Sequence, residues 1–242
     1  MPRVRDLSLT ISEAGTVTAR HYAAASATAP TLVLAHGAGA DQRHRFMVTV
    51  ASDLAAAGVQ VVTFNFLYTE QRRRVPDRTE KLDACYRAAV IAARHHLDRS
   101  AVFIGGKSMG GRIATHVAGA DDADALGIRG VVALGYPLHP PGKPQQLRAA
   151  HLSRIRVPML IVQGERDPFG TPAELQPVLD AIAGDVTLHV VENGDHSLAP
   201  SRQKDRVAAA YVELHQHVAD WIRSQNERGD SSSPPPQERR TI

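Results

Sequence analysis

The residues with the clearest chemical potential begin with a serine in a glycine-rich turn. Ser108 lies at the centre of the segment Gly106-Lys-Ser-Met-Gly110, directly after the apolar run 101–104. This G-x-S-x-G pattern is typical of a tight strand-to-helix turn that exposes a nucleophilic serine. Side chains at Gly106 and Gly110 would collide with the strand and the helix, which explains the two glycines. The pattern predicts that Ser108 is a nucleophile, although an ordinary turn serine would fit it too.

An acid and a base follow two later apolar runs. Asp167 comes shortly after the run 158–162, and His196 comes shortly after the run 186–191. A histidine can take the proton of a serine, while an aspartate fixes the imidazole tautomer and stabilises its charged form. We therefore predict Ser108 as nucleophile, His196 as base and Asp167 as the orienting acid.

Glu165 is the nearest rival of Asp167, because it lies two residues earlier in the chain. We expect the Glu165 carboxylate to face solvent or the end of the strand. Asp167 itself has an alternative interpretation as a turn or helix-capping aspartate.

A second glycine-rich turn, His36-Gly-Ala-Gly-Ala40, follows the apolar run 31–35. A serine nucleophile needs backbone donors for the negative oxygen of its tetrahedral intermediate. The backbone amides of Ala38 and Met109 are the predicted oxyanion hole, and Met109 also lies at the start of a helix, where the dipole favours negative charge. His36 is predicted to hold the turn by hydrogen bonds rather than to act as a base.

Other residues in loops on the same side are predicted to contact the substrate. The predicted contact residues are Gly37, Tyr68, Tyr136 and Phe169. Basic residues also gather there, at 43–45, at Arg72-Arg-Arg74 and at Lys107 and Arg112. They are interpreted as solvated loop charge, as a mouth that attracts an acidic substrate, or as a patch for a partner. The sequence assigns no role to Lys107 or to the Arg72–Arg74 loop.

Short apolar runs alternate with amphipathic stretches, which predicts a mostly parallel sheet with helices on both faces. The predicted strands are 31–35, 59–64, 100–104, 130–134, 158–162 and 186–191, after an antiparallel hairpin formed by 4–11 and 16–22. The predicted helices are 44–57, 79–97, 110–119, 172–183 and 205–223. In such sheets, ligands bind beyond the carboxyl ends of the strands, where the candidate residues lie.

The length of 242 residues suits one α/β domain, predicted over 1–224. Residues 225–242 lack an apolar pattern and are predicted to be a disordered tail. The longest insertion, 136–156, is too short for a separate lid domain.

Composition narrows the class of function. A net charge of +3 and an aromatic content of 5% argue against a nucleic-acid partner. No apolar stretch is long enough to span a membrane, and the start of the chain lacks a signal-peptide core, so a cytoplasmic location without membrane contact is expected. The single cysteine excludes an internal disulfide, and no ligand spacing indicates a metal site.

Four motifs carry a resemblance to a known family over about residues 5–224. They are H-G-A-G-A at 36–40, G-K-S-M-G-G-R at 106–112, G-E-R-D at 164–167 and G-D-H-S at 194–197. With them the chain resembles the α/β-hydrolase superfamily, and is similar to its small, lidless, dienelactone-hydrolase-like branch of predicted hydrolases. The resemblance implies a three-layer α/β-hydrolase fold without a lid domain, a Ser–Asp–His triad and no cofactor.

The leading hypothesis is a cofactor-independent serine hydrolase that cleaves a carboxylic ester or thioester through an acyl intermediate on Ser108. The short insertions predict an open site, suited to a small-molecule acyl substrate or one that extends along the surface. The alternatives are a catalytically silent interaction protein or subunit of a larger complex, and a serine-dependent acyltransferase or perhydrolase. Monomer and dimer both remain open.

Overall fold

An eight-stranded sheet organises the chain in the computed structural model, which describes residues 2–11, 15–200 and 203–231. The strand order across the sheet is β1-β2-β4-β3-β5-β6-β7-β8. The strands are β1 (Arg3–Thr10), β2 (Thr16–Ala23), β3 (Thr31–Ala35), β4 (Gln60–Phe64), β5 (Val102–Lys107), β6 (Ile128–Leu134), β7 (Met159–Gly164) and β8 (Val186–Val191).

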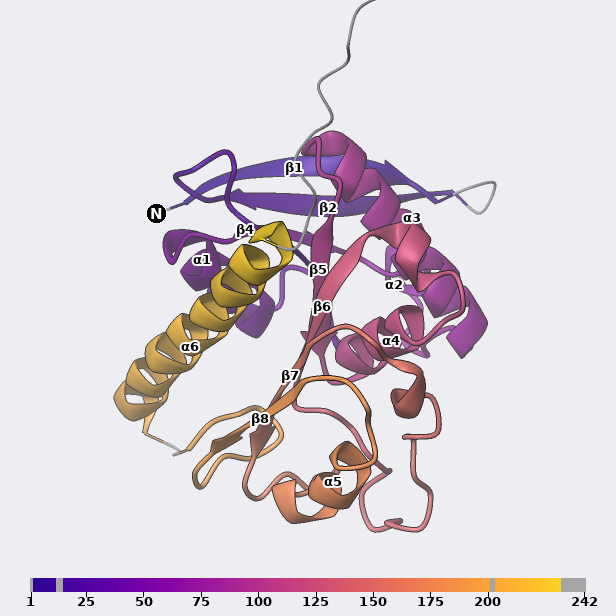
Figure 1. Ribbon diagram of the computed structural model, residues 1–242, viewed down its shortest axis with the longest axis vertical. Helices are drawn as coiled ribbons and strands as arrows, with labels where there is room; N and C mark the ends of the chain where they lie inside the picture. Colours follow the sequence, from indigo (N-terminus) through magenta and orange to yellow (C-terminus); the bar gives the residue numbers. More distant parts are fainter. Residues whose placement is uncertain (1, 12–14, 201–202, 232–242) are drawn as a thin grey trace, which may run out of the picture.

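The sheet is parallel from β4 to β8 and antiparallel at its N-terminal edge. β1 pairs with β2, and β2 pairs with β4, in antiparallel register, whereas every pair from β4–β3 to β7–β8 is parallel. Figure 1 shows the β1–β2 hairpin lying across one end of the sheet, turned relative to the central strands. The predicted hairpin and mostly parallel sheet are confirmed, while residues 12–14 between the hairpin strands lie outside the described part of the chain.

Residues along the central strands alternate between two cores, because successive side chains in a strand point to opposite faces. In β3, Val33 and Ala35 face one core, whereas Leu32 and Leu34 face the other. Both faces of this sheet must therefore be covered, which accounts for the nearly continuous apolar runs in the sequence.

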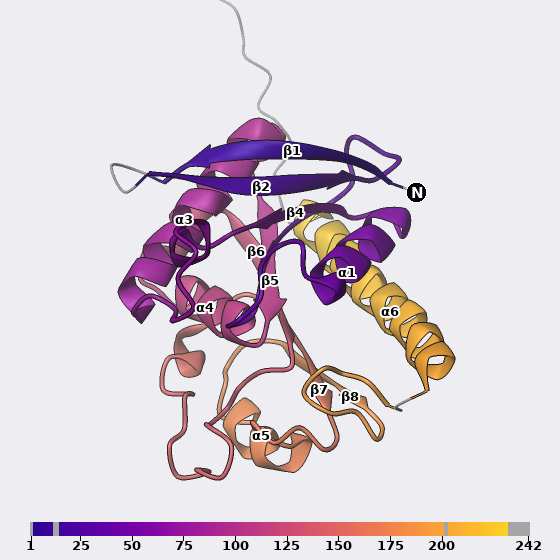
Figure 2. The same cartoon turned by 180° about the vertical axis from the view of Figure 1, so that it is seen from behind.

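Helices cover the two faces as separate layers (Figures 1 and 2). One face carries α1 and α6, and the opposite face carries α3 and α4. The helices are α1 (Arg45–Ala56), α2 (Leu67–Glu70), α3 (Thr79–His96), α4 (Met109–Ala118), α5 (Pro172–Leu179) and α6 (Lys204–Ser231). Two short 3-10 helices, Ala123–Leu126 and Leu152–Arg154, complete the described elements. The predicted three-layer arrangement is confirmed.

The predicted disordered tail is wrong for residues 225–231, because α6 continues to Ser231. Its end is held by Arg129, whose guanidinium donates to the Asn226 side chain at 2.8 Å. A polar sequence without an apolar stripe can continue a helix that packing has already nucleated. The remaining tail residues, 232–242, lie outside the described part of the chain.

Element boundaries differ from the sequence prediction mainly where local geometry decides them. β5 extends to Lys107 instead of ending at Ile104, and the short helix α2 was not predicted. The segment 136–156 contains only the 3-10 helix Leu152–Arg154, in agreement with a fold without a lid domain. None of the described helices is long and apolar enough to cross a bilayer.

Candidate active site

Ser108 occupies the sharp turn between β5 and α4. Its backbone has φ 51° and ψ −116°. Residues other than glycine rarely adopt such a positive φ. The Ser108 carbonyl accepts the first helical hydrogen bond from the Arg112 amide at 3.0 Å, so the helix begins immediately after the serine. The turn therefore presents the hydroxyl at the carboxyl end of the central strand.

The glycines on either side of this turn are required by close backbone packing. A Cβ at Gly106 would lie 2.5 Å from the Gly110 carbonyl carbon and 2.6 Å from the Ala35 oxygen. A Cβ at Gly110 would lie 2.4 Å from the same Ala35 oxygen. Since backbone atoms cannot yield at these distances, the structure supports the steric explanation of both glycines.

The strain at Ser108 leads to a stability prediction that is independent of activity. Both Ser108→Gly and Ser108→Ala remove the hydroxyl, but only glycine tolerates the positive φ. We expect Ser108→Gly to unfold with a free energy about 1 kcal/mol higher than Ser108→Ala, the reverse of the usual order of these two residues. Urea unfolding of the two variants measures the difference, and a more stable alanine variant would contradict a strained turn.

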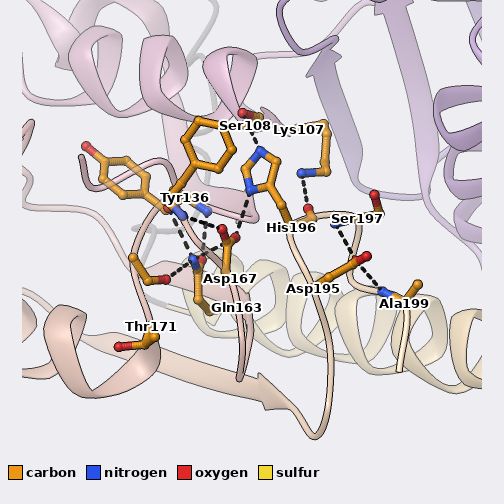
Figure 3. A network of polar contacts seen from close by, with 12 residues as sticks. Lys107, Ser108, Tyr136, Gln163, Asp167, Thr171, Asp195, His196, Ser197 and Ala199 are labelled. Carbon is orange, nitrogen blue, oxygen red and sulfur yellow. Dashed lines mark hydrogen bonds and ion pairs between the residues drawn. The ribbon is translucent and has the colours of Figure 1, made fainter. Parts of the chain in front are cut away.

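A continuous line of hydrogen bonds joins the serine, the histidine and the aspartate (Figure 3). The Ser108 Oγ lies 2.9 Å from His196 Nε2, and His196 Nδ1 lies 2.8 Å from Asp167 Oδ2. The three residues come from the ends of β5, β7 and β8 and are up to 88 positions apart in the chain. The structure thus brings together all three residues that the sequence singled out.

Asp167 is held in place by several hydrogen-bond donors. Its carboxylate is buried, with a side-chain exposure of 0%, and accepts from the Phe169 amide at 2.8 Å and from Gln163 Nε2 at 3.0 Å. Hydrogen bonds donated to a carboxylate stabilise its negative charge. Glu165, by contrast, is exposed and accepts from the Asn193 amide at 2.7 Å, as expected for a residue at the strand end.

Gln163 is a site residue that the sequence analysis missed. It is fully buried at the end of β7, where its side-chain oxygen accepts from the Tyr136 amide at 2.7 Å and its amino group donates to the Gly170 carbonyl at 2.7 Å. It therefore links the loop after β6 to the turn that carries Asp167. The available signal was a polar residue four positions before Asp167 in a run of buried apolar residues.

The Lys107 side chain contacts the backbone of the loop that carries His196. Its Nζ donates to the backbone carbonyl of His196 at 2.6 Å and lies 5.9 Å from the centre of the Phe46 ring. An added Cβ at Gly135, which has φ 67°, would lie only 2.7 Å from Nζ, so the missing side chain makes room for the ammonium group. Burial lowers the pKa of Lys107 to about 8, an effect that Asp167 and Asp195 partly oppose.

The loop that carries His196 is fixed from several sides. Asp195 Oδ1 accepts from the Ser197 amide at 2.8 Å, and the Tyr211 hydroxyl of α6 donates to the Ser197 carbonyl at 2.7 Å. Together with the Lys107 bond, these contacts hold the backbone on both sides of the imidazole. The Phe169 ring packs 4.2 Å from the imidazole centre and limits its rotation.

His36 holds the turn after β3, as the sequence analysis predicted. Its Nδ1 lies 2.9 Å from the Gly37 carbonyl oxygen, and its Nε2 accepts from the Phe66 amide at 3.2 Å. These partners require a proton on Nδ1 and none on Nε2, and burial lowers the pKa of His36, which favours this neutral form.

The same contacts orient the two predicted oxyanion donors. The Gly37 carbonyl and the Ala38 N–H belong to one planar trans peptide, so fixing the carbonyl aims the N–H in the opposite direction. The Ser108 carbonyl, which accepts from Arg112, fixes the Met109 N–H in the same way. Within the described residues neither amide donates a hydrogen bond, so both are available to a ligand.

A family model described as an alpha/beta hydrolase domain matches residues 28–223. The chain belongs to the α/β-hydrolase family. The predicted superfamily is thereby confirmed, and membership supports a hydrolase activity.

Solved structures share this hydrolase fold over nearly the whole chain. The chain is similar to a dienelactone hydrolase from Anabaena variabilis, with 18% identity, a TM-score of 0.72, and coverage of 92% of this chain and 98% of that chain. It is also similar to an α/β serine hydrolase without lid from Xanthomonas campestris, with 17% identity, a TM-score of 0.67, and coverage of 96% and 97%. An α/β serine hydrolase homologue from Coxiella burnetii matches with 18% identity, a TM-score of 0.70, and coverage of 91% and 97%. At these identities the likeness concerns the fold.

A cavity of about 660 Å³ opens beside Ser108 and His196 in this hydrolase fold. Of the four predicted contact residues, only Gly37 lines it. Tyr68 is buried with its ring centre 6.1 Å from that of His36, and Tyr136 is buried with its hydroxyl donating to the Arg148 carbonyl at 2.7 Å. The prediction for these two tyrosines is wrong, because both rings fill the protein core.

Phe169 was the other predicted contact outside the cavity lining. It packs against the imidazole of His196 instead, and so contacts the proposed base rather than the cavity. The cavity is walled by α1 and α6. The sequence analysis connected only the basic residues 43–45, at the start of α1, with a substrate.

The basic residues near this side of the sheet do not act as one group. Arg43 lies 3.6 Å from Asp6, Arg73 lies 2.7 Å from Asp77, and none of these four residues lines the cavity. Arg45 does line it and is exposed. In the described part of the chain, no group of three or more His, Cys, Asp or Glu side chains is arranged to hold a metal ion.

Proposed function

We propose that this protein is a serine hydrolase that cleaves a carboxylic ester or thioester through an acyl intermediate on Ser108. The observation that carries the proposal is the unbroken hydrogen-bond line from Asp167 through His196 to Ser108. A Ser–His–Asp line of this kind, at the tip of a strained turn, is the arrangement that activates a serine hydroxyl.

In the first step, Ser108 Oγ attacks the carbonyl carbon while its proton moves to His196 Nε2. Asp167 keeps the other ring proton on Nδ1 and stabilises the imidazolium that forms. The negative oxygen of the tetrahedral intermediate lies against the amides of Ala38 and Met109, which supply hydrogen bonds without reorganisation.

In the second half of the reaction, the intermediate collapses and breaks the bond to the leaving alcohol or thiol. His196 returns its proton to the leaving group, which leaves an acyl-Ser108 ester. A water molecule then attacks this ester while its proton moves to His196. The collapse of the second intermediate releases the acid, and His196 returns the proton to Ser108 Oγ. Apart from this water molecule, the protein supplies every group in the cycle, so the proposed reaction needs no cofactor.

A fluorophosphonate probe tests the proposal directly, because it forms a stable adduct only with an activated serine. We expect peptide mass spectrometry to find the adduct on Ser108. If Ser108 stays unlabelled in protein with an intact far-UV spectrum, the proposed function is wrong, and a silent interaction protein becomes the better interpretation.

Lys107 is a positioning residue in this proposal, because it holds the His196 backbone rather than the reacting atoms. We expect Lys107→Met to lower kcat by about 10- to 100-fold with little change in KM, since a small displacement of the base is costly. Lys107→Arg should recover part of the loss by restoring a cationic donor. Lys143→Met, at an exposed position, is the control and should leave kcat unchanged.

The lowered pKa of Lys107 gives this role a pH signature. As pH rises through about 8, the ammonium loses its proton and the charge-assisted bond to His196 weakens, so kcat/KM of the wild type should fall. The free energy of unfolding should rise as pH increases from about 8 to the ordinary Lys pKa of 10.5. In this range the unfolded chain binds more protons than the folded one. Lys107→Met should lack both effects. A Lys107→Met variant with the same alkaline limb and pH-dependent stability as the wild type would show that Lys107 is not their source.

A further inference from the structure

The cavity beside Ser108 continues as a groove between two helices. Its lining runs from Ser108 and His196, along the turn 37–40, to the first turns of α1 and the N-terminal half of α6. Figure 1 shows α1 and α6 on the same face of the sheet, with the N-terminal end of α6 extending past α1. The groove is therefore directly connected to the proposed nucleophile.

The walls of this groove are mainly apolar. Phe46 and Met47 contribute from α1, while α6 contributes Val207, Ala208, Tyr211 and Val212. The α6 residues lie at helical spacing on one side of the helix. Val212 is 61% exposed, although it is a large apolar residue next to a catalytic site. Apolar surface in water is unfavourable, so a ligand that covers it gains affinity.

Most of the polar groups of the groove are already engaged with the protein. Asp53 accepts from His215 at 2.7 Å, and the His44 ring accepts from the Phe46 amide at 3.3 Å. Lys107 is bound to the His196 carbonyl. Arg45 is the one charged lining residue that forms no hydrogen bond or ion pair within the described part of the chain, and its side chain is exposed. Apart from Ser108, His196, Arg45 and the hydroxyls of Thr49 and Ser197, the side chains left to contact a substrate are therefore apolar.

The two walls of the groove contact each other and the His196 loop. The Phe46 and Tyr211 rings meet edge to face at 5.8 Å, and the Tyr211 hydroxyl is anchored to the loop of His196. This tie holds α6 in place relative to the proposed base. A largely apolar groove of this size is the usual form of a site for a small organic group.

We propose that the groove between α1 and α6 holds the apolar part of the ester, and that Ala208 and Val212 limit the size of the apolar group that fits. This inference rests on the proposed function and adds the substrate class: esters or thioesters that carry an extended apolar acyl or alcohol group. Acetyl esters of small alcohols would leave the groove empty and gain nothing from it.

Narrowing the groove tests the inference, and the chain offers a matched control. Ala208 lines the groove, whereas its neighbour Ala209 is also exposed on α6 but does not. We therefore compare Ala208→Trp with Ala209→Trp. The acyl arm uses p-nitrophenyl acetate and p-nitrophenyl hexanoate, and the alcohol arm uses methyl acetate and hexyl acetate.

We expect Ala208→Trp to lower kcat/KM for the hexanoate or for hexyl acetate by about 10-fold or more, with little change for the short ester of the same arm. The arm that responds identifies which part of the ester occupies the groove. Ala209→Trp should leave the long-to-short ratio of kcat/KM unchanged in both arms. Val212→Trp provides a second narrowing variant if Ala208→Trp does not fold.

Two results would overturn the inference in distinguishable ways. Suppose that acetate hydrolysis depends on Ser108. The groove assignment alone is then wrong if Ala208→Trp changes neither long-to-short ratio of kcat/KM, or if Ala209→Trp changes the ratios by the same factor. If the wild type hydrolyses no ester in a Ser108-dependent manner, the proposed function is wrong and the groove assignment falls with it.

Discussion

Replacing Ser108 with alanine is expected to abolish ester hydrolysis, lowering kcat by about 10⁴-fold or more. In the proposed mechanism the Ser108 hydroxyl oxygen forms the acyl bond, and no other hydroxyl contacts His196 Nε2 in the described residues. The fold should persist, because alanine fits the space of the serine and the turn is built by its neighbouring glycines. Initial rates on p-nitrophenyl acetate, together with thermal unfolding of the same samples, measure both effects.

Ser100→Ala is the matched control, since Ser100 is an exposed serine outside the site. It should retain wild-type rates. Activity of Ser108→Ala within about 10-fold of the wild type would mean that another group is the nucleophile, and the acyl-Ser108 mechanism would have to be abandoned.

Replacing Asp167 with asparagine is expected to lower kcat by about 10⁴-fold. The carboxylate accepts from His196 Nδ1, Gln163 Nε2 and the Phe169 amide at once. An asparagine has only one acceptor oxygen, so its amino group must face at least one of these donors. The imidazole would then lose its favoured tautomer and the stabilisation of its charged form.

Glu165 provides the sharpest comparison for this prediction. The sequence left open that Glu165 could replace Asp167, but the Glu165 side chain is exposed and bonded to the Asn193 amide. We expect Glu165→Gln to retain kcat within a few-fold of the wild type and Asp167→Asn to show no partial rescue by Glu165. Substantial activity in Asp167→Asn that disappears in the double variant would reverse this assignment.

The secondary structure could be predicted largely from the sequence because its causes are local. β3 is fully buried and was predicted at its observed bounds, and α1 ends where Gly58 adopts φ 90°. The predictions failed where packing decides the outcome. α6 runs past residue 224 because the end of the helix has tertiary partners such as Arg129.

The substrate contacts could not be predicted in the same way. Tyr68 and Tyr136 follow strands that lead to the site, so their position in the chain favoured a role there. Strand order determines which loop meets which, but the direction of a side chain depends on its own backbone and on the space around it. Both tyrosines point into the core, whereas Ala208 and Val212, more than 90 positions from Ser108, form the wall of the groove.

The sequence by itself determined the chemistry available to this protein: a serine in a glycine-flanked turn, an acid, a base and a glycine-rich loop, each at the end of an apolar run. Parallel strands end at one edge of a sheet, so this much follows from order along the chain. Only the tertiary structure decided which groups complete the site. The Lys107 bond to His196, the Gln163 bond to Asp167 and the helical groove all join residues through space, and no local pattern encodes such contacts.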